Sequence, residues 1–87
     1  MNAAYGMQRI FLAVANFSDS AITNSNFSYA TLISANFQNA KLINVNFSYA
    51  DLSYANLQNA TLVGTNLNNA ILCNTTMSNG TVLNRNC

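Results

Sequence analysis

Residues 50–64 read ADLSY-ANLQN-ATLVG, three groups of five residues in which alanine opens each group and leucine stands at its centre. The same spacing continues in both directions, and every fifth residue from Leu12 to Val82 is apolar. The central residues are Leu12, Phe17, Ile22, Phe27, Leu32, Phe37, Leu42, Phe47, Leu52, Leu57, Leu62, Leu67, Leu72, Met77 and Val82. A small residue usually precedes each by two positions, with Ile10 and Val45 as exceptions. Such strict repetition predicts a repeat architecture.

A period of five excludes two regular structures. An α-helix turns about 100° per residue, so successive central residues would lie roughly 140° apart around its axis. A flat strand would send them to opposite faces in turn. We therefore expect each repeat to be a short extended piece followed by a turn. The small and central side chains would point toward a common axis, and the other three would point outward.

The groups AKLIN, ADLSY, ANLQN and ATLVG, with ANFQN as an aromatic variant, resemble the A(D/N)LXX repeat of the pentapeptide-repeat family. The resemblance covers residues 10–83 and implies an all-β fold, the right-handed quadrilateral β-helix. In that fold four repeats make one coil of twenty residues, so this chain would form just under four coils. Residues 1–9 are then expected to be an N-terminal cap or the remnant of a longer protein, and residues 84–87 a C-terminal cap or tail.

Under that geometry residues twenty apart stack, and the sequence can be sorted into columns. The phenylalanines fall on two opposite walls, and Val82 completes the inward column of Ile22, Leu42 and Leu62. Outside, asparagines form two ladders: Asn16, Asn36 and Asn56 on one wall and Asn26, Asn46 and Asn66 on the opposite wall. We expect their side-chain amides to bond to the copies above and below.

The charged residues are few. Arg9, Lys41 and Arg85 are the basic residues and Asp19 and Asp51 the acidic ones. Because nucleic-acid binders carry a basic stripe or patch, we expect no nucleic-acid partner. Two carboxylates also cannot imitate a row of phosphates, which weighs against the mimicry of duplex DNA by which acidic relatives act on topoisomerases. No apolar run is long enough for a transmembrane helix, so no membrane partner is expected.

The residues of the common catalytic and metal sites are missing. Histidine is absent and the two carboxylates fall in separate walls, so general acid–base and nucleophilic catalysis lack their usual groups. Two cysteines without histidine do not make a zinc site. We therefore predict a protein that is not an enzyme and that binds no metal or cofactor.

The tail CNTTMSNGTVLNRNC, residues 73–87, resembles the C-terminal ending of cyanobacterial family members, in which a cysteine pair brackets a turn. Ser78 and Asn79 stand where those proteins have Pro-Asp. The resemblance implies a disulfide between Cys73 and Cys87, and two free thiols are the alternative. A bridge requires the tail after about Val82 to leave the lattice and fold back. It would favour an oxidising compartment such as the periplasm or thylakoid lumen, whereas free thiols would favour the cytoplasm.

Exposed tyrosines are the most distinctive outward feature. Tyr29 and Tyr49 are expected to stack at equivalent corners one coil apart, and Tyr54 lies one repeat beyond. Because tyrosine is enriched at protein interfaces, we predict a structural or protein-interaction module that binds its partner through these three residues.

Several alternatives stay open at this point. The tyrosines can simply pack over the coil, and the chain can associate with itself end to end or side by side. Other candidate functions are a DNA-mimicking gyrase inhibitor or protector, a secreted effector, and an ice-binding surface. The regular threonine rows that would support ice binding are missing.

Overall fold

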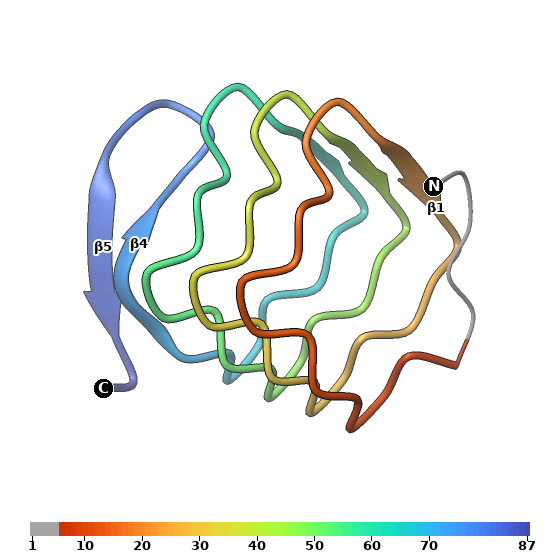
Figure 1. The fold of residues 1–87 in the computed structure, drawn as a ribbon, viewed down its shortest axis with the longest axis horizontal. Helices are drawn as coiled ribbons and strands as arrows, with labels where there is room; N and C mark the ends of the chain where they lie inside the picture. The colour runs from red at the N-terminus through yellow and green to blue at the C-terminus, as the bar shows by residue number, and fades with distance from the viewer. Residues whose placement is uncertain (1–5) are drawn as a thin grey trace.

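The computed structural model describes residues 6–87, which form stacked turns of chain with short strands. The strands are β1 (Ala21–Thr23), β2 (Lys41–Ile43), β3 (Thr61–Val63), β4 (Leu72–Thr76) and β5 (Val82–Arg85). Strands β1, β2 and β3 pair in parallel, and each residue faces the one twenty positions further along the chain. Strands β4 and β5 pair antiparallel at the C-terminal end of the stack, as Figure 1 shows.

The twenty-residue register extends beyond the strands. Isolated parallel bridges join residues twenty apart on the other sides of the coil, among them Phe11 with Thr31 and Asn16 with Asn36. Each bridge uses two backbone hydrogen bonds: for Phe11 and Thr31, the N–H of Thr31 donates to Ile10 (2.9 Å) and the N–H of Leu12 donates to Thr31 (2.7 Å). The predicted stacking of residues twenty apart is therefore confirmed.

The corners of the coil are left-handed residues that recur every five positions. Fourteen residues other than glycine have positive φ, and the eight between Arg9 and Asn44 are spaced five apart. At most corners the N–H of the following residue donates to the central residue three positions earlier, as from Ala15 to Leu12 at 3.1 Å. A turn with φ > 0 at its third residue has this geometry. Seven of the fourteen are asparagine, which tolerates the left-handed region better than most residues.

Two of every five side chains fill the core, as predicted. The buried apolar residues are Phe17, Ile22, Phe27, Ala30, Leu32, Ala35, Phe37, Ala40, Leu42, Val45, Phe47, Ala50, Leu52, Ala55, Leu57, Ala60, Ala70 and Leu72. Phe17 stacks on Phe37 with centroids 5.1 Å apart, and Phe27 stacks on Phe47 at 5.4 Å. The two stacks meet edge to face across the core, an arrangement that stabilises by about 0.5–1.5 kcal/mol per aromatic pair beyond burial.

The ends of the repeat differ from the sequence prediction in two places. Val82 follows the five-residue spacing, yet it is 55% exposed and does not complete the inward column. The reason is that Val82 begins β5, which runs back along β4 in the opposite direction. At the other end the coil pattern reaches Met7 and Arg9, which donate to Asn26 and Ser28. The expected N-terminal cap at 1–9 therefore joins the coil from Met7, and its first five residues lie outside the described part.

The predicted hydrogen bonding of the asparagine ladders is wrong. The stacked positions are as expected, but each side-chain oxygen accepts from the backbone N–H two residues later in its own repeat. Asn16, Asn26, Asn36, Asn46, Asn56 and Asn66 all do so at 2.9 Å. This local bond competes successfully because it satisfies a backbone donor at the start of each turn. Amide-to-amide bonding between coils occurs instead at a corner, where Asn44 Nδ2 donates to Asn24 Oδ1 at 3.2 Å.

Candidate functional site

An aromatic column stands on one corner of the coil. The rings of Tyr29 and Tyr49 are parallel within 3° and their centroids lie 4.9 Å apart. The guanidinium carbon of Arg9 lies 4.4 Å from the centroid of the Tyr29 ring. About half of each tyrosine is exposed, 47% for Tyr29 and 51% for Tyr49. We call these three residues the tyrosine column.

The backbone fixes the tyrosine column in place. Arg9, Tyr29 and Tyr49 are all left-handed corner residues, with φ of 61°, 62° and 60°. Their N–H groups donate to Ser28, Ser48 and Asn68 of the next coil at 3.0, 3.0 and 3.1 Å. The stack is therefore a consequence of the twenty-residue register, because every coil returns the same corner to the same place.

The structure brings Tyr29 and Tyr49 together and places Tyr54 elsewhere. Tyr54 is also a left-handed corner residue (φ 62°), but it belongs to the next corner, in register with Val14, Ser34 and Asn74. It is 63% exposed, and within residues 6–87 no ring stacks on it. The three tyrosines predicted to bind a partner together thus occupy two neighbouring corners, with Tyr54 one repeat beyond Tyr49.

Arg9 is the member of the column that sequence reasoning missed. In the sequence it is one of three basic residues. The signal was available, since Arg9 precedes Tyr29 by twenty residues, as Tyr29 precedes Tyr49. A guanidinium over an exposed aromatic ring stabilises by about 0.5–1 kcal/mol.

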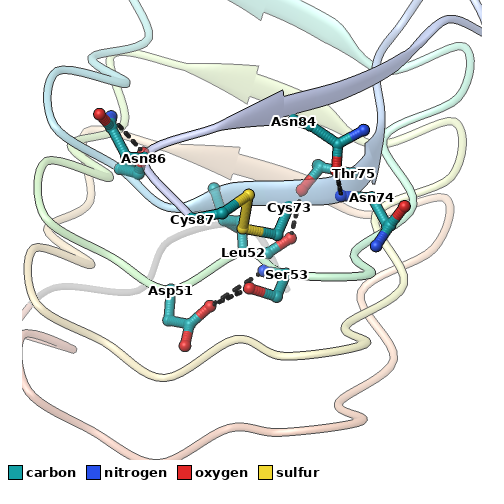
Figure 2. The surroundings of a disulfide bond; sticks show 10 residues. Asp51, Leu52, Ser53, Cys73, Asn74, Thr75, Asn84, Asn86 and Cys87 are labelled. Carbon is teal, nitrogen blue, oxygen red and sulfur yellow. Dashed lines mark hydrogen bonds between the residues drawn. A yellow bond between two sulfur atoms is a disulfide. The ribbon is translucent and has the colours of Figure 1, made fainter.

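The second candidate feature is the C-terminal hairpin. A disulfide joins Cys73 of β4 to Cys87, with the two Cα atoms 5.5 Å apart, and closes the hairpin (Figure 2). Side chains of the tail also cover backbone groups of the last coil. The N–H of Asn74 donates to Asn84 Oδ1 at 2.9 Å, Asn86 Nδ2 donates to Ala70 at 3.0 Å, and Arg85 Nη2 donates to Leu67 at 3.2 Å.

One hydroxyl of this hairpin is buried in the core. Thr75 occupies an inward slot that alanine fills in most repeats, and it is fully buried. Its Oγ1 donates to the carbonyl of Leu52 at 2.7 Å, which satisfies the polar atom inside the core (Figure 2). Thr65 does the same with Leu42 at 2.7 Å. The hairpin therefore rests on a core whose polar atoms are satisfied.

Residues 6–87 contain no cluster of three or more side chains of the types that hold a metal ion, and no pocket opens among them. In the same range no helix has the length and apolar character needed to cross a bilayer. The tyrosine column and the C-terminal hairpin are thus the features left to explain.

Comparison with known proteins places the repeats of this chain in a family. The model of the pentapeptide repeats matches residues 12–48 and 50–81 in eight copies. A search of curated proteins found no significant match. HetL from the cyanobacterium Nostoc sp. strain PCC 7120, a pentapeptide repeat protein involved in the regulation of heterocyst differentiation, has a similar structure. Its TM-score is 0.67 at 28% identity, over 84% of this chain and 40% of HetL.

A second solved structure agrees. Rfr23, a pentapeptide repeat protein from the cyanobacterium Cyanothece 51142, gives a TM-score of 0.51 at 32% identity, over 85% of this chain and 54% of Rfr23. The chain thus spans about half the length of these relatives or less. The repeat match covers most of the residues that build the coil, and the chain belongs to the pentapeptide-repeat family.

Proposed function

We propose that this chain is a non-enzymatic interaction module that binds another protein through the tyrosine column. The observation that carries the proposal is the exposed, parallel stack of Tyr29 and Tyr49 with Arg9 on its end. Large aromatic side chains and arginine are the residues that most often dominate binding energy at protein interfaces.

The stack determines what a partner would meet. Arg9 and Tyr49 cover the two faces of the Tyr29 ring, and Tyr29 covers one face of the Tyr49 ring, which leaves the ring edges and hydroxyl groups for a partner. Because the rings are already held in place, binding would cost little side-chain entropy. A partner would therefore supply hydrogen-bond groups for the phenolic hydroxyls and apolar surface for the ring edges. Tyr54 on the neighbouring corner would extend the contact along the wall between them.

The same geometry supports a finer description of the fold. Four left-handed residues, Arg9, Val14, Asp19 and Asn24, turn the chain before Tyr29 returns to the corner of Arg9. We infer a right-handed quadrilateral β-helix of just under four coils, of the kind the family resemblance implies. In such a rod the outward side chains form flat walls and repeated corners, which suits recognition of an extended surface.

A regulatory role is consistent with this proposal. HetL is involved in the regulation of heterocyst differentiation. Regulation by a protein without catalytic residues requires binding to another molecule, and the formal net charge of +1 here favours contacts other than charge pairing. We therefore expect the complex to be insensitive to salt, in contrast to binding of an acidic DNA mimic.

The disulfide favours an oxidising compartment. A bridge that closes the C-terminal hairpin persists in oxidising surroundings, so we propose the periplasm or the thylakoid lumen as the site of action. Mass spectrometry of the protein isolated from its host under alkylating conditions tests this, and two alkylated thiols would contradict it.

The test of the binding role is a pull-down from host lysate with matched variants. Tyr29→Asn/Tyr49→Asn removes both rings and keeps a residue that suits the left-handed corner. We expect this variant to lose at least about tenfold in affinity for the captured partner, since truncating one interface anchor often costs 2 kcal/mol or more.

Two further variants make the result specific. Tyr29→Phe/Tyr49→Phe keeps the stack and removes the hydroxyl groups, and it should bind at intermediate strength. Val63→Asn changes an exposed residue of β3 and should bind like the wild type. Capture of the same partners by the folded Tyr→Asn variant would disprove the proposal.

A gyrase supercoiling assay tests the alternative of a gyrase inhibitor or protector, and an ice-recrystallisation assay tests the alternative of an ice-binding surface.

A further inference from the structure

The ring of Tyr54 has an open face within the stack. Corner residues twenty apart occupy successive coils, so Ser34 precedes Tyr54 in its column and Val14 precedes Ser34. The side chain of serine is too short to cover an aromatic ring. The exposed fractions agree, since Tyr54 is 63% exposed, whereas the stacked Tyr29 and Tyr49 are 47% and 51% exposed. Coils of the described chain lie on both sides of this face, so it is not an end of the stack.

The neighbouring corner shows what covers such a face. There Arg9 precedes Tyr29 by one coil, and its guanidinium carbon lies 4.4 Å from the ring centroid. Ser34 precedes Tyr54 in the same way, with φ of 60° against 61° for Arg9. The column of Tyr54 therefore lacks the guanidinium that the tyrosine column supplies from within the chain. Because successive coils are about 4.8 Å apart, the layer of Ser34 can hold one planar group between Tyr54 and Val14.

A carboxylate with an unbonded oxygen lies beside this position. Asp51 lies on the wall that leads to the corner of Tyr54, three residues earlier in the chain. Its Oδ1 accepts from the N–H of Ser53 at 3.0 Å and from the hydroxyl of Ser53 at 2.6 Å (Figure 2). Both bonds draw the carboxylate toward the residue next to Tyr54. In the described part of the chain no donor bonds to Oδ2 of Asp51 and no cation pairs with it.

The fold does not need the negative charge of Asp51. Asparagine stands at the same position of six other repeats, and its Oδ1 accepts the same backbone bond at 2.9 Å. An amide oxygen thus serves the turn as well as a carboxylate oxygen does. The charge and the unbonded Oδ2 of Asp51 are left for a group of another molecule.

We propose that the partner protein places an arginine side chain at this corner. Its guanidinium lies on the open face of Tyr54, in the layer of Ser34, and donates to Oδ2 of Asp51. This inference rests on the proposed function and names the chemistry of the partner, a segment with an exposed arginine. Arginine fits better than lysine, because a planar guanidinium stacks on an aromatic ring and directs donors from its edge at the same time. One exposed ion pair changes an affinity only a few fold, so the complex stays nearly insensitive to salt.

The variant Ser34→Arg tests the geometry within the chain itself. The introduced side chain precedes Tyr54 as Arg9 precedes Tyr29, and Arg9 shows that a left-handed corner accepts arginine. In a crystal structure of this variant, the guanidinium should lie over the ring of Tyr54 and within hydrogen-bond distance of Oδ2 of Asp51. A guanidinium that is disordered or directed away from Tyr54 would overturn the proposal.

A peptide titration of the whole protein tests the chemistry of the ligand. The probe is acetyl-Gly-Arg-Gly-amide, followed by NMR of the backbone amides at constant ionic strength, with acetyl-Gly-Lys-Gly-amide as the comparison. The arginine peptide should shift the amides of Ser34, Asp51 and Tyr54 with a dissociation constant of roughly 10–100 mM, as expected for one exposed anchor. It should bind at least about threefold more tightly than the lysine peptide.

Four variants make the titration specific. Tyr54→Asn should weaken binding of the arginine peptide about fivefold and Asp51→Asn about threefold. Ser34→Arg should abolish binding, because its own guanidinium occupies the ring. Asp19→Asn removes the same charge from an exposed corner of another column and should bind like the wild type.

Two results of the titration would overturn the proposal. One is equal binding of the arginine and lysine peptides. The other is binding that Tyr54→Asn weakens and Asp51→Asn does not, which would indicate stacking on the ring without the ion pair.

The pull-down separates this inference from the proposed function. If Tyr29→Asn/Tyr49→Asn loses the partner while Tyr54→Asn and Asp51→Asn retain it at full affinity, the tyrosine column binds the partner and the arginine contact is wrong. If Tyr29→Asn/Tyr49→Asn retains the partner, the proposed function fails, and the peptide titration still decides whether Tyr54 and Asp51 bind arginine.

Discussion

At the scale of single residues, the left-handed corner residues carry a conformational free-energy cost in every repeat. Each repeat needs one residue in the left-handed region, which costs roughly 1–2 kcal/mol for most side chains and less for asparagine, aspartate or glycine. Val14, with φ of 64°, is the least suited corner residue because it is β-branched. The chain accepts this cost at a position that is exposed and on the first coil.

Val14→Asn should therefore stabilise the protein by about 1 kcal/mol, which raises the thermal midpoint by roughly 4–8 °C in a domain of this size. Val63→Asn is the matched control, because Val63 is also exposed but lies in β3. Asparagine is unfavourable in strands, so the control should lower the midpoint slightly. A lower midpoint for Val14→Asn would show that the left-handed conformation of Val14 does not strain the backbone.

Gly64 illustrates a second constraint on corner residues. It has φ of 61°, and a Cβ atom there would collide with Oδ1 of Asn44, the residue whose amide bonds to Asn24. Gly80 also has positive φ, but a Cβ atom there would lie 4.0 Å from its nearest neighbour, Gln58 Nε2. The two glycines share the conformation and differ in the space around them.

Gly64→Ala should accordingly cost about 2 kcal/mol and Gly80→Ala about 1 kcal/mol, measured as free energies of unfolding in urea. In an Asn44→Ala background the excess cost at Gly64 should disappear, which a double-mutant cycle measures directly. Equal costs at the two glycines in the wild-type background would argue against the contact with Asn44.

At the scale of elements, the C-terminal hairpin is held by the disulfide and by side chains of the tail. The loop closed by Cys73 and Cys87 spans fourteen positions, and closing a loop of this size stabilises by about 3 kcal/mol in the chain-entropy model. The bonds from Arg85 and Asn86 to the last coil do not depend on the bridge.

Reduction should therefore lower the thermal midpoint and loosen β4 and β5 before the rest of the coil. Hydrogen exchange resolved by residue is the measurement. Protection in β4 and β5 should fall in the presence of reductant, while protection in β1 and β2 is retained. The Cys73→Ser/Cys87→Ser variant should reproduce the effect without reductant. A uniform loss of protection along the coil would show that the hairpin is not an independent element.

The elements also show what could be predicted from the sequence. The spacing of central residues predicted which side chains face inward, and the family resemblance supplied the coil of twenty residues that stacks them. It could not predict where the coil ends, because Val82 keeps the spacing while β5 reverses direction. The reversal depends on hydrogen bonds and a disulfide between residues that the repeat does not relate.

The candidate site was predictable only in part. The pair of Tyr29 and Tyr49 follows from a separation of twenty residues, and Arg9 would have followed from the same count. Tyr54 lies five residues after Tyr49, and a step of five moves a residue to the next corner, so it does not join the stack. The bonding of the asparagines was not predictable from the stacking alone, because a backbone N–H two residues later in each repeat donates to the side-chain oxygen.

At the scale of the whole molecule, different residues of each repeat determine the fold and the binding surface. The small and central residues of each repeat fill the core, and the other three face outward, where they can vary without changing the coil. This division explains how the tyrosine column can be added to a fold that the core alone specifies. It also predicts that tolerance to substitution changes sharply between adjacent residues.

Ala40 and Lys41 test that division most directly. Ala40 is fully buried at an inward position, and Lys41, the next residue, is exposed on β2. Leucine at position 40 would overpack the core, which typically costs about 1–3 kcal/mol, whereas leucine at position 41 would replace an outward side chain on a strand. Thermal unfolding of Ala40→Leu and Lys41→Leu is the measurement. The account predicts a midpoint lowered by roughly 5–20 °C for Ala40→Leu and nearly unchanged for Lys41→Leu. Equal midpoints would contradict the assignment of two inward and three outward residues on which the fold and the proposed surface depend.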